Sequence, residues 1–157
     1  MGLRRLRAFL RRHLRIGLDT SVFIYQLEAN PRYVELAEVA FAWVEEPGHS
    51  AITSTLTMLE LLVHPYRQSS ERRVDEFYGL LATYPNLEWV APDLEIADLA
   101  ARIRPEHRLR TPDAVQAASV IRAGATGLIT NDAVFKRVAG FETLLLDDLL
   151  AEASAVE

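Results

Sequence analysis

The sequence contains no cysteine and no run of 18 or more apolar residues. The first absence excludes disulfides and thiolate chemistry, and the second means that no membrane span is expected. The basic start, MGLRRLRAFLRRHLR, is not followed by an apolar h-region or a small-residue cleavage site, so we do not interpret it as a secretory signal. These absences are compatible with a cytoplasmic protein, which is what we expect.

The motifs of several other protein classes are also missing. There is no G-x-S-x-G, and the four histidines show no useful spacing, which disfavours a serine hydrolase. There is no P-loop and no G-x-G-x-x-G, so nucleotide binding of those kinds is not expected. A receiver-like signalling domain would need a phosphoacceptor aspartate at the third predicted strand and a lysine at the last strand. The third strand offers only Asp93, and the only lysine, Lys136, falls on a predicted helix.

Charge is unevenly distributed along the chain, which has a formal net charge of −5. Six of the 17 basic residues are arginines within residues 1–15, a segment without acidic residues. Residues 16–157 therefore hold 11 basic and 22 acidic residues, a formal charge of −11. The net charge of residues 16–157 does not indicate a nucleic-acid-binding protein. To act on a polyanion, this part of the chain would require a local cationic patch or a bound cation.

What is present is an alternation of short apolar strands and amphipathic helices over 157 residues, enough for one domain with a sizeable core. Strands are predicted at 15–19, 50–54, 87–91, 127–130 and 142–146. Helices are predicted at 20–27, 32–46, 55–63, 69–84, 93–103, 111–124, 132–140 and 147–153. This order predicts an α/β fold, a three-layer α/β/α sandwich around a mostly parallel five-stranded sheet. We expect a domain at 15–153, preceded by a basic extension at 1–14.

Four acidic residues fall on the carboxyl side of the predicted sheet. Asp19 and Asp132 leave strands there, Asp113 begins a returning helix, and Glu60 lies on the helix after the second strand. Taken alone, each aspartate can equally well be a helix cap or a negative charge that the helix dipole stabilises. Glu60 lies in TLTMLELLV, a helix that is apolar nearly all round, where a carboxylate is rarely found unless it is paired, protonated or metal-bound.

Together, four like charges in one crevice would repel each other and raise one another's pKa values. A cation would relieve this repulsion. Carboxylate ligands without a cysteine or histidine pair suit Mg²⁺ or Mn²⁺ rather than structural zinc. A site of this kind usually acts on phosphates, because the cation can activate water and offset the charge of the phosphoryl oxygens.

The segments GLDTSVFIY, STLTMLELL, RTPDAVQAASVIRAGATGLITND and FETLLLDDL resemble the PIN domain family, and most of all the VapC-type toxin ribonucleases of bacterial toxin–antitoxin pairs. The resemblance covers about residues 15 to 150. Its most specific part is Asp113-Ala114 followed by Thr130-Asn131-Asp132. It implies a compact α/β/α sandwich and hydrolysis of single-stranded RNA that depends on Mg²⁺ or Mn²⁺, leaving a 5′-phosphate and a 3′-hydroxyl.

The same resemblance implies roles for individual residues and for partners. The family's acidic positions map onto Asp19, Glu60, Asp113 and Asp132, which would hold one or two metal ions. Ser21 would supply a hydroxyl near the metal, with Thr130 as a supporting residue. Family members usually form homodimers, and an antitoxin protein blocks the site with an inserted arginine or a bulky side chain.

The other arginines and the first fourteen residues are less specific. Arg110 is the best candidate for an RNA contact because it lies three residues before Asp113, followed by Arg108 and Arg67. MGLRRLRAFLRRHL departs from the family pattern. It is either a basic amphipathic helix that binds RNA or an anionic surface, or the product of an overcalled start site or a solvated, partly ordered tail.

Two alternatives to a toxin ribonuclease stay open. The chain could be a PIN nuclease of RNA maturation or one directed at DNA. It could also be a catalytically silent PIN scaffold that binds a partner, although none of the four carboxylates is missing.

Overall fold

The computed structural model describes residues 1–151. Its sheet has five strands in the order β3-β2-β1-β4-β5, and every neighbouring pair is parallel. The strands are β1 (Arg15–Leu18), β2 (Ser50–Ser54), β3 (Leu87–Val90), β4 (Gly127–Thr130) and β5 (Glu142–Leu145). The predicted α/β sandwich with a parallel five-stranded sheet is confirmed.

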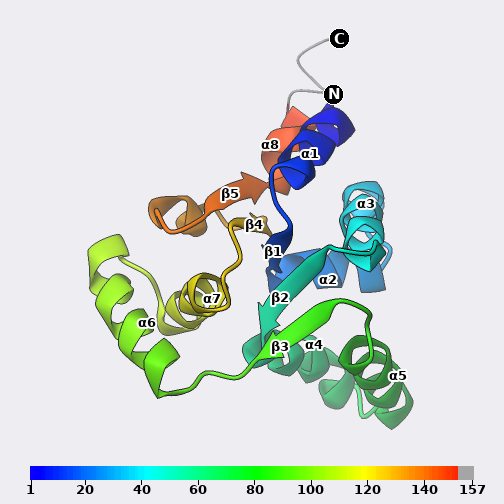
Figure 1. The fold of residues 1–157 in the computed structure, drawn as a ribbon. Helices are drawn as coiled ribbons and strands as arrows, with labels where there is room; N and C mark the ends of the chain where they lie inside the picture. The colour runs from blue at the N-terminus through cyan, green and yellow to red at the C-terminus, as the bar shows by residue number, and fades with distance from the viewer. Residues whose placement is uncertain (152–157) are drawn as a thin grey trace.

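The helices cover both faces of the sheet (Figure 1). They are α1 (Gly2–Arg11), α2 (Thr20–Leu27), α3 (Val34–Glu45), α4 (Thr55–Arg67), α5 (Glu71–Ala82), α6 (Leu94–His107), α7 (Thr111–Arg122), the 3₁₀ helix η1 (Ala133–Arg137) and α8 (Leu146–Ala151). One apolar cluster joins the sheet to α1, α2, α3 and α8, and the other joins it to α6, α7 and η1. The sheet is therefore buried on both faces, which explains why β1 and β4 are apolar except for Arg15 and Thr130.

Most predicted boundaries are within two residues of the observed ones, and the larger differences involve proline and the chain end. The helix expected to stop before Pro65 continues to Arg67, and the helix expected at 93–103 continues through Pro105 to His107. A proline removes its own N–H donor and its ring crowds the carbonyl four residues earlier. Both prolines lie in the last turn, and each helix ends two residues after its proline. The segment predicted as a short helix at 132–140 is a 3₁₀ helix of five residues. Residues 152 and 153 of the predicted domain lie outside the described part.

The basic extension is a helix whose apolar face is buried in the domain. Leu6, Phe9 and Leu10 of α1 are at most 2% exposed and belong to the core cluster that includes α3 and α8. Leu3 is partly buried against that cluster, whereas Leu14 is exposed. The predicted amphipathic helix is confirmed, and the alternative of a solvated tail is wrong, because burial of these side chains fixes α1 against the domain.

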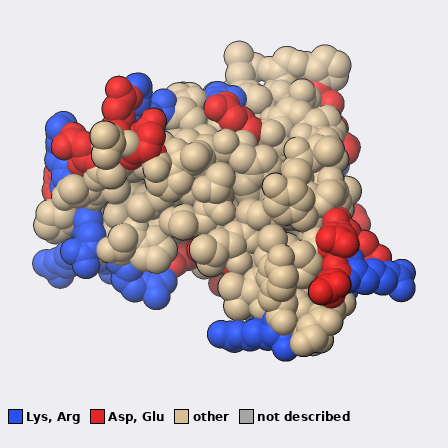
Figure 2. Space-filling model, turned by 90° about the horizontal axis from the view of Figure 1, so that it is seen from below, with Lys and Arg blue, Asp and Glu red and all other residues tan. Residues whose placement is uncertain are grey.

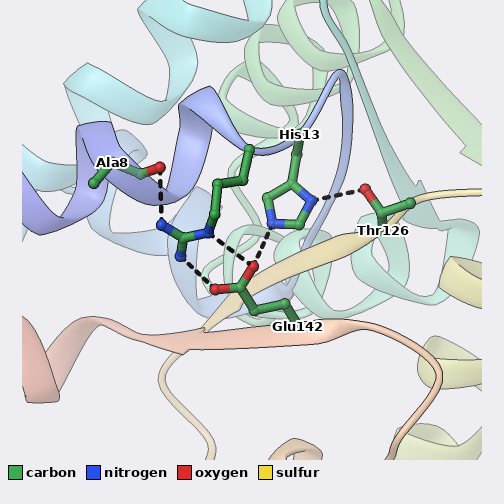
Figure 3. Close-up of polar contacts among 5 residues, drawn as sticks. Ala8, His13, Thr126 and Glu142 are labelled. Atoms are coloured by element: carbon green, nitrogen blue, oxygen red, sulfur yellow. Dashed lines mark hydrogen bonds and ion pairs between the residues drawn. The ribbon is translucent and has the colours of Figure 1, made fainter.

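Polar contacts hold the end of α1 to the beginnings of β4 and β5 (Figure 3). His13 Nδ1 lies 2.7 Å from Thr126 Oγ1, and His13 Nε2 lies 2.8 Å from Glu142 Oε2. Arg12 donates to the Ala8 carbonyl and forms a two-point ion pair with Glu142. The hydrogen bond from Arg12 is the largest cause that lowers the pKa of Glu142, and the bond from His13 adds to it against the opposing effect of burial.

None of the helices in residues 1–151 is long and apolar enough to cross a membrane.

The face seen from below in Figure 1 is mainly uncharged in its middle, and its acidic and basic side chains gather toward the two sides (Figure 2).

Candidate functional site

A cavity of about 570 Å³ lies where β1 and β4 end and where α2, α4 and α7 present side chains. All five residues predicted to act in catalysis line it: Asp19, Ser21, Glu60, Asp113 and Asp132. β1 and β4 are neighbouring strands whose connections lead in opposite directions across the sheet. Open parallel sheets bind ligands at this kind of position, beyond the carboxyl ends of the strands.

Asp19 is the N-cap of α2, and both of its carboxyl oxygens are held. Oδ1 accepts from the Thr20 amide at 2.9 Å, and Oδ2 accepts from the Thr130 hydroxyl at 2.7 Å. Burial, the largest cause, raises the pKa of Asp19 to about 6. The two hydrogen bonds lower this pKa, while the negative charges of Glu60 and Asp132 raise it further. The Asp19 carboxylate is thus held in one position by two hydrogen bonds, but its ionised form is destabilised by burial and by its acidic neighbours unless a cation is bound.

The turn after β4 brings Asp132 to the same place. The Thr130 hydroxyl donates to Asp19 and accepts from the Asp132 amide at 3.0 Å, so one side chain connects both strand ends. Asp132 is an exposed N-cap of η1, and its Oδ1 accepts from the Val134 amide at 3.0 Å. Asp132 can therefore cap η1 and line the cavity at the same time. Thr130, predicted as a supporting residue, contacts Asp19 through its hydroxyl.

Asp113 lies in the first turn of α7, with its side chain 13% exposed. Its Oδ2 accepts from Arg110 Nε at 3.3 Å, and the Arg110 side chain also lines the cavity while 80% exposed. An ion pair this exposed is weak, so Arg110 can leave Asp113 at little cost. Of the three arginines proposed for RNA, Arg110 faces the cavity, whereas Arg67 and Arg108 do not line it.

The expectation that Glu60 lies in apolar surroundings is wrong. Glu60 is exposed, because α4 buries only one narrow face and leaves Leu59 and Val63 in solvent as well. The apolar sequence of the helix misled the inference, since exposed apolar residues are common on protein surfaces. Glu60 nevertheless lines the cavity, as an exposed acidic residue.

Gln116, a buried residue on the cavity wall, was not among the predicted site residues. Its Nε2 donates to the Leu18 carbonyl at 3.1 Å, and its Oε1 accepts from the Ser54 amide at 3.3 Å. Gln116 thus ties α7 to the ends of β1 and β2, and fixes Asp113, one turn earlier on the same helix, relative to Asp19. No pattern in the small-residue helix distinguishes this glutamine from a surface one.

A second missed group connects the cavity rim to α8. Tyr25 lines the cavity, stacks on Tyr33 with ring centroids 4.1 Å apart, and accepts at its hydroxyl from Asn131 Nδ2 at 2.9 Å. Asn131 Oδ1 in turn accepts from the Asp147 amide at 2.9 Å, and Tyr33 donates to Asp147 Oδ1 at 2.6 Å. This network holds the turn after β4, which carries Asp132.

Comparison with known proteins assigns the chain to a family. The family model of the PIN domain matches residues 16–141. The chain belongs to the PIN domain family. The matched range leaves out α1, and a comparison with curated proteins gave no match.

The PIN fold is shared with solved structures of low sequence identity. A toxin–antitoxin complex from Klebsiella pneumoniae is 21% identical, with a TM-score of 0.61, over 83% of this chain and 97% of that chain. VapBC from Salmonella typhimurium, bound to DNA, is 20% identical, with a TM-score of 0.63, over 85% and 98% of the two chains. VapBC2 from Rickettsia felis, bound to a fragment of its promoter DNA, is 17% identical, with a TM-score of 0.60, over 83% and 98%. The resemblance to the PIN family is confirmed, and these neighbours show the shared fold.

The cavity of this PIN domain offers only hard oxygen donors of the kind that Mg²⁺ or Mn²⁺ prefers. Ser21 Oγ is buried without a hydrogen-bond partner, so a donor group on the cavity lining is left unsatisfied. Within residues 1–151, no three histidine or acidic side chains lie close enough together to enclose a metal ion as they stand. The residues therefore fit such an ion by chemistry and shared location, and the ligand set stays a prediction.

Proposed function

We propose that this PIN domain is an endoribonuclease, dependent on Mg²⁺ or Mn²⁺, that hydrolyses phosphodiester bonds of single-stranded RNA. The observation that carries the proposal is the shared cavity of Asp19, Glu60, Asp113 and Asp132 with the unpartnered Ser21 hydroxyl. The toxin–antitoxin complexes among its structural neighbours support a role as the toxin of such a pair. A cytoplasmic location accompanies this role, since its substrate and antitoxin would be found there.

Each side chain has a distinct task in this proposal. A bound Mg²⁺ or Mn²⁺ supplies Lewis acidity for water activation and offsets the negative charge of the phosphoryl oxygens. Asp19, held at both oxygens, and Asp113, on the rigid start of α7, are the fixed ligands. Glu60 and Asp132 are exposed and can act directly or through water. Ser21 helps to orient the attacking water, and cleavage of the P–O3′ bond leaves a 5′-phosphate and a 3′-hydroxyl.

Arg110 has a position suited to substrate binding. Its guanidinium lies beside Asp113, and its side chain is largely exposed at the cavity rim. The ion pair with Asp113 is exposed and weak, so Arg110 can donate to a phosphate oxygen of the substrate instead. Arg110 is therefore a binding residue in this proposal, and Arg67 and Arg108 would act only on parts of an RNA that lie outside the cavity.

A groove next to the cavity suits the antitoxin. It lies between α2, α4 and α5, and Leu27, Leu61 and Phe77 supply much of its apolar lining. Ile24 and Glu60 line both the groove and the cavity, so the two are continuous. A segment of the antitoxin bound in this groove could extend a basic or bulky side chain into the acidic cavity and exclude RNA.

A homodimer also belongs to this proposal. Leu59, Val63 and Tyr66 are 59%, 37% and 62% exposed and follow one another at helical spacing on α4. A stripe of this kind, next to the groove and the cavity, is what a self-associating surface requires.

The proposal is tested with purified wild-type protein and Asp113→Asn on labelled single-stranded RNA, in Mn²⁺, in Mg²⁺ and in EDTA. Asp75→Asn is the matched control, because it removes the same charge from an exposed position of α5 outside the cavity. We expect cleavage by wild type and control that requires metal, with 5′-phosphate products, and a loss of at least about 10²-fold for Asp113→Asn.

Three results would contradict parts of this proposal. Equal cleavage by Asp113→Asn would remove the site assignment. Cleavage of single-stranded DNA but not of RNA would indicate a DNA-directed PIN nuclease. Absence of cleavage at any metal concentration, combined with tight binding of a protein encoded beside this chain, would favour a silent scaffold.

A further inference from the structure

The exposed side of α1 carries a row of arginines. Arg4, Arg7 and Arg11 are exposed, and their spacing of three and four residues places them on one face of the helix. At 1.5 Å per residue, the row is about 10 Å long. We refer to these three residues as the arginine stripe. Residues 1–15 contain no acid, so no carboxylate of the helix itself offsets this charge.

The arginine stripe differs from the other cations of this segment in having no partner. Arg12 is engaged by Glu142 and by a backbone carbonyl (Figure 3), and Arg15 is engaged by Glu88 and Ser50. Within residues 1–151, by contrast, the structure records no hydrogen bond or ion pair for the side chains of the stripe. Three guanidinium groups are therefore available to an external anion without breaking any contact of the fold.

The burial of α1 determines what kind of anion can bind. An amphipathic helix binds a membrane surface by inserting its apolar face between the lipids. Here that face is occupied, since Leu6, Phe9 and Leu10 are packed into the domain. What remains outside is the cationic face alone, and this face suits a flexible chain of phosphates better than a bilayer.

A groove beside the stripe adds a second element. It has a volume of about 340 Å³ and lies between α1 and α3, with Arg7 and Arg11 on one side. Val39, Ala42 and Trp43 of α3 line the other side, together with the carboxylate of Glu46. Cationic side chains next to apolar surface can hold single-stranded nucleic acid, whose bases contact the apolar part. Trp43 is 8% exposed and stacks on His49, so bases would contact mainly Val39 and Ala42.

We propose that the arginine stripe and the groove beside it form a second binding surface for single-stranded RNA, outside the catalytic cavity, that holds the substrate strand by its phosphates. The inference deepens the proposed function and rests on RNA being the substrate. No residue of α1 lines the cavity, so the surface acts on binding of long strands and not on the chemical step. It also gives an acidic domain, at −11 over residues 16–157, a means of retaining a polyanion.

The test compares a triple variant, Arg4→Gln/Arg7→Gln/Arg11→Gln, with wild type. The control triple variant is Arg72→Gln/Arg102→Gln/Arg122→Gln, which removes the same charge from arginines that are each paired with a carboxylate. Binding of an RNA of about 20 nucleotides and one of about 4 is measured in EDTA, so that cleavage does not interfere. Single-stranded DNA and poly-glutamate of similar length are the competing ligands, and steady-state cleavage is then measured in Mn²⁺.

The expected effect depends on length and on salt. Loss of three phosphate contacts lowers the slope of log affinity against log salt by about 2 for a single strand, so wild type loses roughly 20-fold more affinity than the variant between 50 and 200 mM salt. We expect this difference for the long RNA only. In Mn²⁺, the KM for the long RNA rises by about 10-fold or more in the stripe variant, while kcat and both constants for the short RNA stay unchanged. The control triple variant follows wild type.

The outcomes separate this inference from the proposed function. Equal affinity and equal salt slope for the stripe variant and wild type, with cleavage intact, would overturn the second surface and leave the nuclease standing. A stripe-dependent affinity for RNA without any cleavage would support the surface and contradict the nuclease. Tighter stripe-dependent binding of DNA or poly-glutamate than of RNA would overturn the assignment to RNA.

Discussion

Replacing Asp19 with asparagine should stabilise the metal-free protein. The carboxyl group has a pKa of about 6 in the folded chain against 3.8 for the ordinary group. A folded-state pKa above the unfolded one means that the native state binds the proton more tightly. The contribution of this group to stability is therefore greatest below pH 3.8, declines as the pH rises toward 6, and is constant above that value.

The magnitude follows from the size of this shift. Roughly two pKa units correspond to about 3 kcal/mol of stability lost by the ionised wild type at pH 8. Asparagine retains an acceptor for the Thr20 amide but changes the bond to the Thr130 hydroxyl, which costs about 1 kcal/mol. The net gain is about 2 kcal/mol, and a domain of this size gains roughly 2–4 °C in Tm per kcal/mol. We expect Asp19→Asn to melt about 4–8 °C above wild type at pH 8.

The assay is thermal unfolding by circular dichroism in EDTA from pH 4 to pH 8, with Asp75→Asn as the exposed control. The Tm of Asp19→Asn relative to wild type should rise from pH 4 to about pH 6 and then stay constant, whereas the Tm of the control relative to wild type should not change in this way. With Mn²⁺ added, the order should reverse, because a cation that binds only the folded state stabilises wild type by mass action and Asp19→Asn much less. A Tm for Asp19→Asn at or below wild type in EDTA at pH 8 would refute the reasoning.

Four further substitutions probe the packing, the hydrogen bonds and the surface of the domain. Gln116→Leu leaves two buried backbone groups without partners and should cost about 1–3 kcal/mol in urea unfolding, together with reduced cleavage. Gly17→Ala places a Cβ 2.7 Å from Val120 and should cost about 1–3 kcal/mol, whereas Gly79→Ala, with nothing within 4 Å, should stabilise α5 by about 0.5–1 kcal/mol. Leu59→Glu should convert a dimer to monomer in size-exclusion chromatography with light scattering, and an unchanged elution and mass would contradict the proposed α4 surface.

The sheet and most of its helices could be predicted because local signals agreed with the tertiary structure. SAITS and GLIT are strands at the predicted residues, and TSVFIYQL is a helix over its predicted range. Each is bounded by a residue with a clear preference, such as Asp19 as N-cap. The parallel sheet then determined which strand ends meet, and the five predicted catalytic residues line one cavity for that reason.

What could not be predicted depends on contacts between distant segments. The sequence shows that α1 is amphipathic, but not that its apolar face would pack against α3 and α8. The exposure of Glu60 depends on how α4 is rotated about its axis, which a helix with apolar residues on every side does not reveal. Gln116 and the Tyr25–Asn131 pair act through bonds to segments far away in the chain, so no local pattern marks them.

The attachment of α1 also has a consequence during translation. The helix is made before the rest of the domain, yet the surfaces that bury it include α8, which is synthesised about 135 residues later. At 5–20 residues per second, α1 stays without its C-terminal partners for roughly 7–27 s on the ribosome. The contacts of His13 with Thr126 and Glu142 close only at the end of that interval. The N-terminal helix should therefore be among the last elements to reach its native position, and a nascent chain stopped before β5 should leave it accessible to protease.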